Sequence, residues 1–250
     1  MPNVRLTVLG GTGAWPSAGQ ACSGYLVESD GFSLLIDPGY AIVPRLLEHM
    51  APGELGAVIV THRHPDHCAD INPLLRARVM SDEDSAPLPV FAPPGALDAV
   101  LALDRPGLLD RSLALREFDP GSTFEIGPFR AVTTLLPHSV PNAGIRLAAA
   151  GRTMAYTGDT GPSDKIAELA KGADLLLAEA SYVHDEMPDM LRASLSTARQ
   201  AGRDGAAAAV GRLLLTHLMP STDPVRAADE AREGYPGSTQ VAERDLVVDL

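Results

Sequence analysis

The chain has 250 residues and a mass of 26.2 kDa, about the size of one large α/β domain, so we expect residues 1–250 to form a single domain. Its residues are 45% hydrophobic and 21% charged, a composition that excludes a disordered or fibrous protein. The net charge of −12 has the wrong sign for a protein that grips long nucleic acid through its phosphates. Because only 4% of the residues are aromatic, the core must be mainly aliphatic.

The N-terminal segment, the length of the apolar runs and the cysteines bear on the expected cellular compartment. The N-terminal segment carries Arg5 and reaches glycines after a few apolar residues, which predicts a first strand rather than a signal peptide. No apolar run approaches the roughly 20 residues that a membrane span needs. Cys22 and Cys68 form no CxxC motif, so neither a disulfide framework nor a thiolate zinc site is indicated, although one bridge between them stays open. We therefore expect a soluble cytoplasmic protein.

Short apolar runs bounded by glycine, proline and aspartate predict the strands. In chain order these strands are Val4–Leu9, Tyr25–Val27, Ser33–Ile36, Ala57–Val60, Pro89–Ala92, Phe129–Leu136, Ile145–Ala148, Thr153–Tyr156, Asp174–Ala178 and Leu213–Leu215. The periodicity between them predicts helices over 41–50, 69–79, 95–103, 163–171, 196–209 and 224–233. Hairpin turns are expected at 29–31 and 150–152. Hairpins mixed with strand–loop–helix units predict mixed sheets covered by helices.

The segment Thr61–Cys68 holds three of the seven histidines. His62 and His64 lie two apart on an extended segment, so they point to the same side and can share one cation. Asp66 and His67 are adjacent on the following turn and can face a second cation. The alternative is a polar loop whose histidines cap a helix that begins near Ala69. Imidazole and carboxylate ligands without thiolate suit Zn²⁺ first, with Mn²⁺ or Fe as alternatives.

This HxHxDH motif at the end of an apolar strand resembles the metallo-β-lactamase fold hydrolases. The resemblance implies an α/β fold, an αββα sandwich of two mixed β-sheets flanked by helices, with a dinuclear metal site at one edge. It also implies which side chains bind the two divalent ions. The first ion takes His62, His64 and His138, the second takes Asp66, His67 and His217, and Asp159 bridges the two. The last strand, around Val247 to Leu250, is consistent with the same fold.

The segments Leu9–Gly13, Leu35–Gly39 and Ala178–Ser181 resemble the branch that contains ribonuclease Z and the small bacterial phosphodiesterases related to it. Within that branch, Asp37 holds the histidine loop; the alternative is a turn aspartate before Pro-Gly. The resemblance makes Asp66 and Glu179 the candidate catalytic residues.

The sequence departs from that branch at the partner of its glutamate. In ribonuclease Z-like members this glutamate pairs with a histidine that is thought to protonate the leaving oxygen, and Leu195 occupies the position of that histidine. Leucine cannot donate a proton. His184, on the loop after Glu179, is either a substitute or an exposed loop histidine. The long arm with which ribonuclease Z grips tRNA has no counterpart in this sequence.

We expect a metal-dependent hydrolase in which two cations lower the pKa of a shared water and aim the hydroxide at an electrophile. A phosphodiester of a small nucleotide or an RNA end is the first choice of substrate. A lactone, thioester or other activated ester is an alternative, and so are an iron-dependent redox protein of the same fold and a scaffold with an inactive site. The expected partner is a small anionic or ester substrate, not long nucleic acid or a membrane, and a homodimer stays open.

Overall fold

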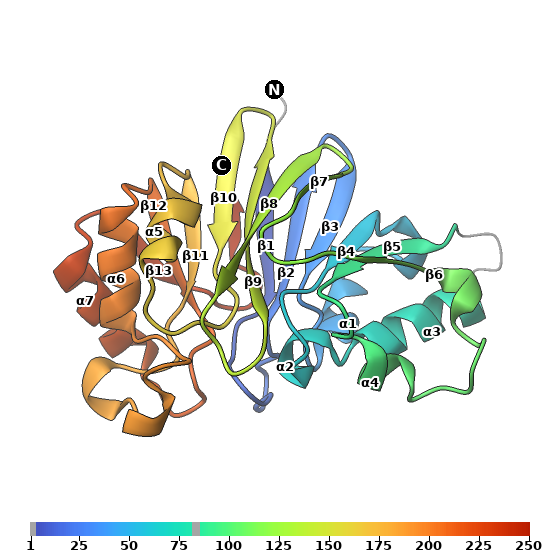
Figure 1. The fold of residues 1–250 in the computed structure, drawn as a ribbon, viewed down its shortest axis with the longest axis horizontal. Helices are drawn as coiled ribbons and strands as arrows, with labels where there is room; N and C mark the ends of the chain where they lie inside the picture. The colour runs from blue at the N-terminus through green and yellow to red at the C-terminus, as the bar shows by residue number, and fades with distance from the viewer. Residues whose placement is uncertain (1–3, 82–85) are drawn as a thin grey trace.

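Two β-sheets pack face to face, with helices on both outer faces, in the computed structural model, which describes residues 4–81 and 86–250 (Figure 1). In order across the first sheet lie β14 (Val247–Asp249), β1 (Arg5–Gly10), β2 (Gly24–Ser29), β3 (Phe32–Ile36), β4 (Ala57–Ile59), β5 (Leu88–Ala92) and β6 (Leu113–Glu117). Across the second sheet lie β13 (Ser238–Val241), β12 (Arg212–Thr216), β11 (Leu175–Glu179), β10 (Arg152–Tyr156), β9 (Asn142–Ala149), β8 (Phe129–Leu136) and β7 (Thr123–Ile126). The predicted αββα architecture is confirmed.

Each sheet is half antiparallel and half parallel. Strands β1, β2, β3 and β14 pair antiparallel, and β3 to β6 run parallel. In the second sheet, β7 to β10 are antiparallel and β10 to β13 are parallel. The predicted hairpins connect β2 to β3 and β9 to β10. Parallel strands bring their carboxyl ends to one edge, where loops can carry a site.

The helices divide between the two outer faces (Figure 1). Those on the first sheet are α1 (Ile42–Leu46), α2 (Pro65–Cys68), α3 (Ile71–Ser81) and α4 (Asp98–Leu101). Those on the second sheet are α5 (Asp164–Ala170), α6 (Ala198–Ala207) and α7 (Pro224–Gly234). Single 3₁₀ turns occupy Pro52–Glu54, Asp110–Ser112, His184–Glu186 and Asp189–Leu191. Side-chain caps start three helices, since Ser163 accepts from the Lys165 amide, Thr197 from the Gln200 amide and Asp223 from the Val225 amide.

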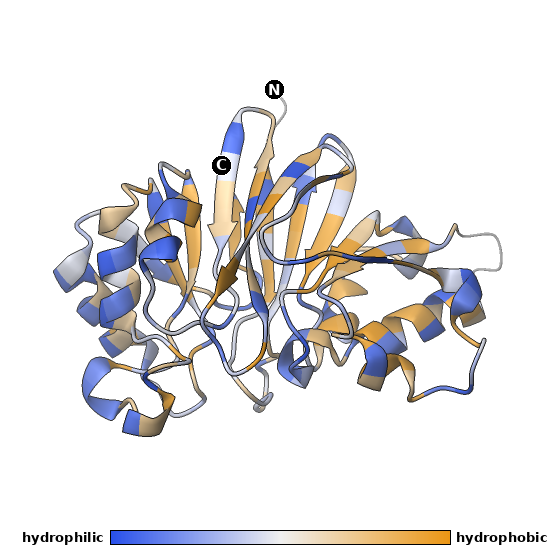
Figure 2. Ribbon diagram, in the orientation of Figure 1, coloured by the Kyte–Doolittle hydropathy of each residue, from blue (hydrophilic) through white to orange (hydrophobic). Residues whose placement is uncertain are grey.

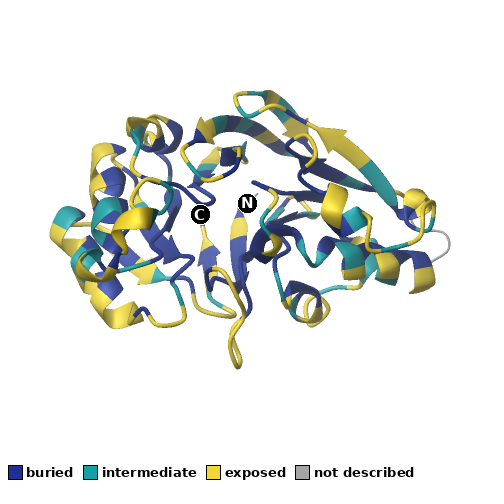
Figure 3. Cartoon of the chain, turned by 60° about the horizontal axis from the view of Figure 1, so that its bottom comes forward, coloured by how far each residue is buried: buried dark blue, intermediate teal, exposed yellow. Residues whose placement is uncertain are grey.

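Three apolar layers hold the sandwich together. The central layer lies between the sheets and is built from alternating inward residues, such as Phe129 and Ala131 of β8. Tyr25 and Tyr156 meet across this layer with ring centroids 5.1 Å apart. The other two layers pack α1, α3 and α4 on the first sheet and α5 to α7 on the second. Figure 2 shows the apolar strands and Figure 3 the buried interior with its exposed helical surface.

Several elements differ from the sequence prediction. The helix expected over 69–79 is α3, and a separate short helix that was not predicted, α2, precedes it and carries part of the histidine motif. Strands β6, β7 and β13 were not predicted. Cys22 and Cys68 are buried and free, so no bridge joins them. No helix in the described part of the chain is long and apolar enough to cross a membrane.

Candidate metal centre

The candidate site lies where several strands end at the same edge of the sandwich. Asp37 follows β3, His62 and His64 follow β4, and His138 follows β8. Asp159 follows β10 and His217 follows β12. Ligands from both sheets therefore meet between them, as the resemblance implies.

The side chains gather into two groups that share one carboxylate. One group contains His62, His64, His138 and Asp159, and the other contains Asp66, His67, Asp159 and His217. The potential ligand atoms of each group all lie within 4.8 Å of one another. The same seven residues that the sequence singles out are thus brought together, and Asp159 belongs to both groups.

Hydrogen bonds on the outer side orient two imidazoles of the first group. Nδ1 of His138 lies 2.8 Å from the carbonyl oxygen of Ser194, so it donates and leaves Nε2 facing inward. Nδ1 of His62 lies 3.0 Å from Oγ1 of Thr61, whose own proton goes to a carboxylate oxygen of Asp37 at 2.8 Å. Both Nε2 atoms lie 3.1 Å from Nδ1 of His64. Three ring nitrogens therefore converge on one point.

His67 and His217 are oriented in the same way in the second group. Nδ1 of His67 donates to Oδ2 of Asp37 at 2.8 Å. Oγ of Ser181 donates to Glu179 at 2.6 Å and so accepts from Nδ1 of His217 at 2.9 Å. Their Nε2 atoms then face carboxylates: His67 lies 3.1 Å from Oδ1 of Asp159, and His217 lies 3.2 Å from Oδ2 of Asp66. Outward donation of this kind fixes the ring of a metal-binding histidine.

Two buried atoms at this point lack hydrogen bonds. Nε2 of His67 and Oδ1 of Asp159 are buried and have no hydrogen-bond partner within the described residues. An unpaired buried polar atom is costly, and two such atoms that face each other suit a cation between them. The donor set of imidazole nitrogens and carboxylate oxygens thus fits divalent metal ions, Zn²⁺ among them.

Asp37 is the hub that holds the histidine loop. It is fully buried and accepts from the Thr61 amide at 2.7 Å and from the Tyr156 hydroxyl at 2.9 Å, besides the bonds from Thr61 Oγ1 and His67. Both Asp37 and His217 adopt positive φ, 50° and 58°, which costs a non-glycine residue about 1–3 kcal/mol. The fold therefore maintains strained backbone at the two positions that orient the centre.

The charges of the centre shift several pKa values. Burial and the neighbouring His67 hold the pKa of His62 well below its usual value. Burial acts to raise the pKa of Asp159, but His217 and His67 outweigh it and hold that pKa well below the usual range. Burial likewise acts to lower the pKa of His67, but Asp159 and Asp37 raise it well above normal. The carboxylates thus draw positive charge to the centre.

Glu179 lies behind the centre rather than within it. It is buried and accepts from the amides of Thr160 and Ser196 and from Ser181. Its carboxylate lies 4.0 Å from Nδ1 of His217, and Ser181 is hydrogen-bonded to both. Burial, followed by the charge of Asp159, raises the pKa of Glu179 to about 8. Sequence reasoning found Glu179 but missed Ser181, although Ser181 stands two residues after it on the same strand end.

The structure places Leu195 and His184 in the wall of the same small cavity. None of the seven candidate ligands lines this cavity within the described residues. The His184 amide donates to the Glu230 carboxylate at 2.9 Å. Ala14 also contacts a candidate ligand, because its amide donates to Oδ2 of Asp66 at 2.9 Å. Sequence reasoning missed this contact, since an alanine side chain gives no signal of it.

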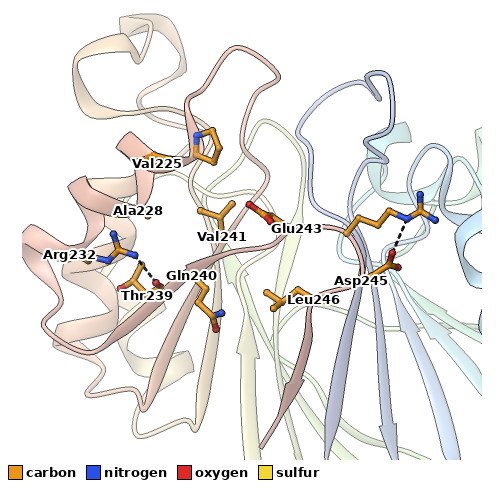
Figure 4. Close-up of a pocket in the computed structure, with 11 residues that line it drawn as sticks. Val225, Ala228, Arg232, Thr239, Gln240, Val241, Glu243, Asp245 and Leu246 are labelled. Carbon is orange, nitrogen blue, oxygen red and sulfur yellow. Dashed lines mark hydrogen bonds and ion pairs between the residues drawn. The ribbon is translucent and has the colours of Figure 1, made fainter.

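Cavities open on both sides of this edge. One of about 540 Å³ has His138 in its wall, next to Pro137 and Val140, and Lys165 of α5 also lines it. Another of about 490 Å³ lies between α7 and the segment 239–246, where Arg232 donates to the Thr239 carbonyl (Figure 4). No candidate ligand lines this second cavity within the described residues. Of these two cavities, the one beside His138 has a candidate ligand in its wall.

Comparison with known proteins identifies the family. Residues 33–218 match the family described as the beta-lactamase superfamily domain. The chain belongs to the β-lactamase superfamily. The protein is a metallo-hydrolase with the metallo-β-lactamase fold, of the ribonuclease Z-like branch, and the fold implies divalent metal binding.

Three relatives illustrate this placement within the superfamily. The probable metallo-hydrolase YhfI of Bacillus subtilis (strain 168) is 30% identical over 247 residues, 98% of this chain and 99% of that protein. Its crystal structure has a TM-score of 0.90 at 29% identity, covering 99% and 100% of the two chains. Ribonuclease Z of Haloferax volcanii is 28% identical, covering 96% of this chain and 93% of that protein. A diphosphatase of the PhnP family, at 20% identity, has the same fold with a TM-score of 0.75, covering 100% and 98%.

Proposed function

We propose that this superfamily member hydrolyses a phosphodiester of a small nucleotide or an RNA end at a dinuclear metal centre. The observation that carries the proposal is the convergence of seven side chains in two groups that share Asp159. Two divalent ions bound there would supply Lewis acidity and an activated water. Since both sheets contribute ligands, residues 1–250 would have to act as one domain.

The residues of the chain itself would have distinct tasks. The seven candidate ligands would hold two ions, with Zn²⁺ the first choice. Asp37 and Ser181 would keep imidazole nitrogens facing inward through the hydrogen bonds to His67 and His217. Glu179 has the contacts of a positioning residue, because it reaches the centre through Ser181. The side chain of Leu195 cannot protonate a leaving group.

The substrate would bind in the cavity beside His138. Its wall is mainly apolar, with Lys165 as the cationic side chain that lines it. Lys165 is exposed, and its ammonium group forms no hydrogen bond or ion pair with the described residues. A free ammonium group beside a candidate metal ligand suits a substrate that carries negative charge, which an acidic protein must attract locally. This favours a phosphodiester over a neutral lactone.

A substrate panel tests the proposal. Metal-reconstituted protein would be assayed with bis(p-nitrophenyl) phosphate, cyclic nucleotides, a lactone and an acyl thioester. We expect turnover of the phosphodiesters, with p-nitrophenyl esters far ahead of alkyl esters because no acid assists the leaving group. Turnover of the lactone or thioester alone would reject the phosphodiester assignment and favour the ester alternative.

The two lysines of the chain provide a matched pair for substrate binding, because the sequence contains only Lys165 and Lys171. Lys165→Met should raise KM for an anionic phosphodiester roughly three- to tenfold with little change in kcat, since an exposed charge contributes about 0.5–1.5 kcal/mol. Lys171→Met removes the same charge at the end of α5, outside the cavity lining, and should leave KM unchanged. Equal effects of the two variants would show that Lys165 acts only through net charge.

A further inference from the structure

The small cavity that Leu195 and His184 line lies between the 3₁₀ turns of residues 184–191 and the start of α6, in the orange part of Figure 1. Its volume is about 130 Å³. Arginines from two elements line it, namely Arg192, Arg199 and Arg203, together with His184 and Leu195. Three guanidinium groups around one small cavity are unusual in a chain with a net charge of −12.

The ion pairs around this cavity leave donors free. Arg192 pairs with Asp189 at 2.8 Å, and Nη2 of Arg199 pairs with Glu230 at 3.2 Å and with Glu233 at 3.7 Å. Nε of Arg199 is buried and has no hydrogen-bond partner in the described part of the chain. Arg203 is exposed, and its guanidinium group forms no hydrogen bond or ion pair with those residues either. A guanidinium group without an acceptor can donate to the oxygens of an anion that enters the cavity.

The size and chemistry of the cavity select the ligand. Its volume is well below the roughly 300–1,000 Å³ of sites for drug-sized molecules, so it suits one small group rather than a whole nucleotide. Guanidinium donors match the oxygens of phosphate in charge and geometry. We propose that this arginine cavity is an anion site that binds a phosphate group through Arg199 and Arg203, with His184 beside it.

The arginine cavity lies next to the metal centre without sharing its ligands. The segment that carries Leu195 connects the two: the Ser194 carbonyl accepts from His138, and the Ser196 amide donates to Glu179 at 3.3 Å. An anion held on this segment would therefore sit beside the groups that position the centre. Phosphate binding by these arginines, which lie outside the ligand set, is independent of the reaction at the centre.

A histidine signal reports on this cavity separately from the metal centre. Of the seven histidines, five are candidate ligands, which leaves His184 in the cavity and His49 elsewhere. Inorganic phosphate would be titrated into metal-loaded protein while the C2 proton resonances of both are followed by NMR. We expect a saturable shift for His184 and none for His49. A His184 resonance that does not move would overturn the proposal, whatever the protein hydrolyses.

Two arginine variants and a second ligand sharpen the test. Arg203→Ala should weaken the His184 titration by phosphate roughly ten- to hundredfold, the effect of losing a hydrogen bond to a charged group. Arg130→Ala, an exposed arginine of β8, removes the same charge away from the cavity and should leave the titration unchanged. If the two variants weaken binding equally, the site is not specific. Repeating the titration with 5′-AMP shows whether the phosphate belongs to a nucleotide or is the free ion. A His184 shift with 5′-AMP equal to that with inorganic phosphate indicates that the site accepts the phosphate of a nucleotide. A shift with inorganic phosphate alone indicates that it binds the free anion.

Discussion

Replacing Asp37 by Asn tests how the protein prepares its histidines to bind metal. The carboxylate of Asp37 accepts from Thr61, Tyr156 and His67, four hydrogen bonds in all, and it is fully buried. An asparagine has the same shape but offers an NH₂ group on one side. That group must face either Nδ1–H of His67 or the Thr61 amide, neither of which can turn away.

Both outcomes have a measurable magnitude. If the NH₂ group faces His67, the imidazole moves its proton to Nε2, and the affinity for the second metal should fall about 10- to 100-fold, as for other changes to groups that orient metal ligands. If it faces Thr61, two buried donors meet, and the free energy of unfolding should fall by about 1–3 kcal/mol. Asp37→Ala leaves all four donors unpaired and should prevent folding, since total stability is only about 5–15 kcal/mol.

Competition with a chromophoric chelator measures the metal affinity, and thermal unfolding of the same samples measures stability. Asp204→Asn is the control for metal affinity alone, because Asp204 is also buried but lies on α6 away from the centre. Asp37→Asn with unchanged metal affinity and an unchanged melting temperature would refute this account of the hydrogen-bond hub.

Three further outcomes are expected. Burial raises the pKa of Asp204 to about 7, so the folded state holds this proton more tightly than the unfolded state, and stability should fall as the pH rises from about 4 to 7. Asp204→Asn should abolish this pH dependence and stabilise the protein above pH 7 by about 4 kcal/mol at most. Urea unfolding across that pH range measures both effects. Leu195→His should speed cleavage of alkyl phosphodiesters by up to roughly 10²- to 10⁴-fold and of p-nitrophenyl esters far less, as steady-state rates will tell. A chelator should lower the melting temperature, because metal joins ligands only in the folded state; an unaltered value would contradict metal binding.

The sequence predicts the central strands of the fold well, because they are short apolar runs between turn residues. Strand β8 is an example, since its expected bounds Phe129–Leu136 are those of the structure. Strand β6, Leu113–Glu117, was missed because its exposed residues include Arg116 and Glu117, which hide the alternation of an edge strand. Strand β13 was missed because three of its four residues, Ser238, Thr239 and Gln240, are polar. It is part of the sheet through its parallel pairing with β12.

The spacing within Thr61–Cys68 indicates four of the candidate ligands, and the family resemblance supplies His138, Asp159 and His217. The resemblance also supplies Asp37, but other groups that contact the ligands could not be predicted. Ser194 contributes only its carbonyl oxygen, and Ala14 only its amide, so neither side chain carries a signal. The helix predicted to start near Ala69 starts at Ile71, and a separate short helix begins at Pro65, because Pro at the first helical position lets the motif itself form the turn.

Metal content tests the central claim most directly. Purified protein reconstituted with Zn²⁺ and freed of excess metal should hold two ions per chain by mass spectrometry of the elements. Asp66→Ala, which alters only the second group, should hold one ion, and Arg130→Ala, a surface control, should hold two. A wild-type protein that binds no metal, or an Asp66→Ala variant that still holds two ions as tightly, would contradict a dinuclear centre built from these residues.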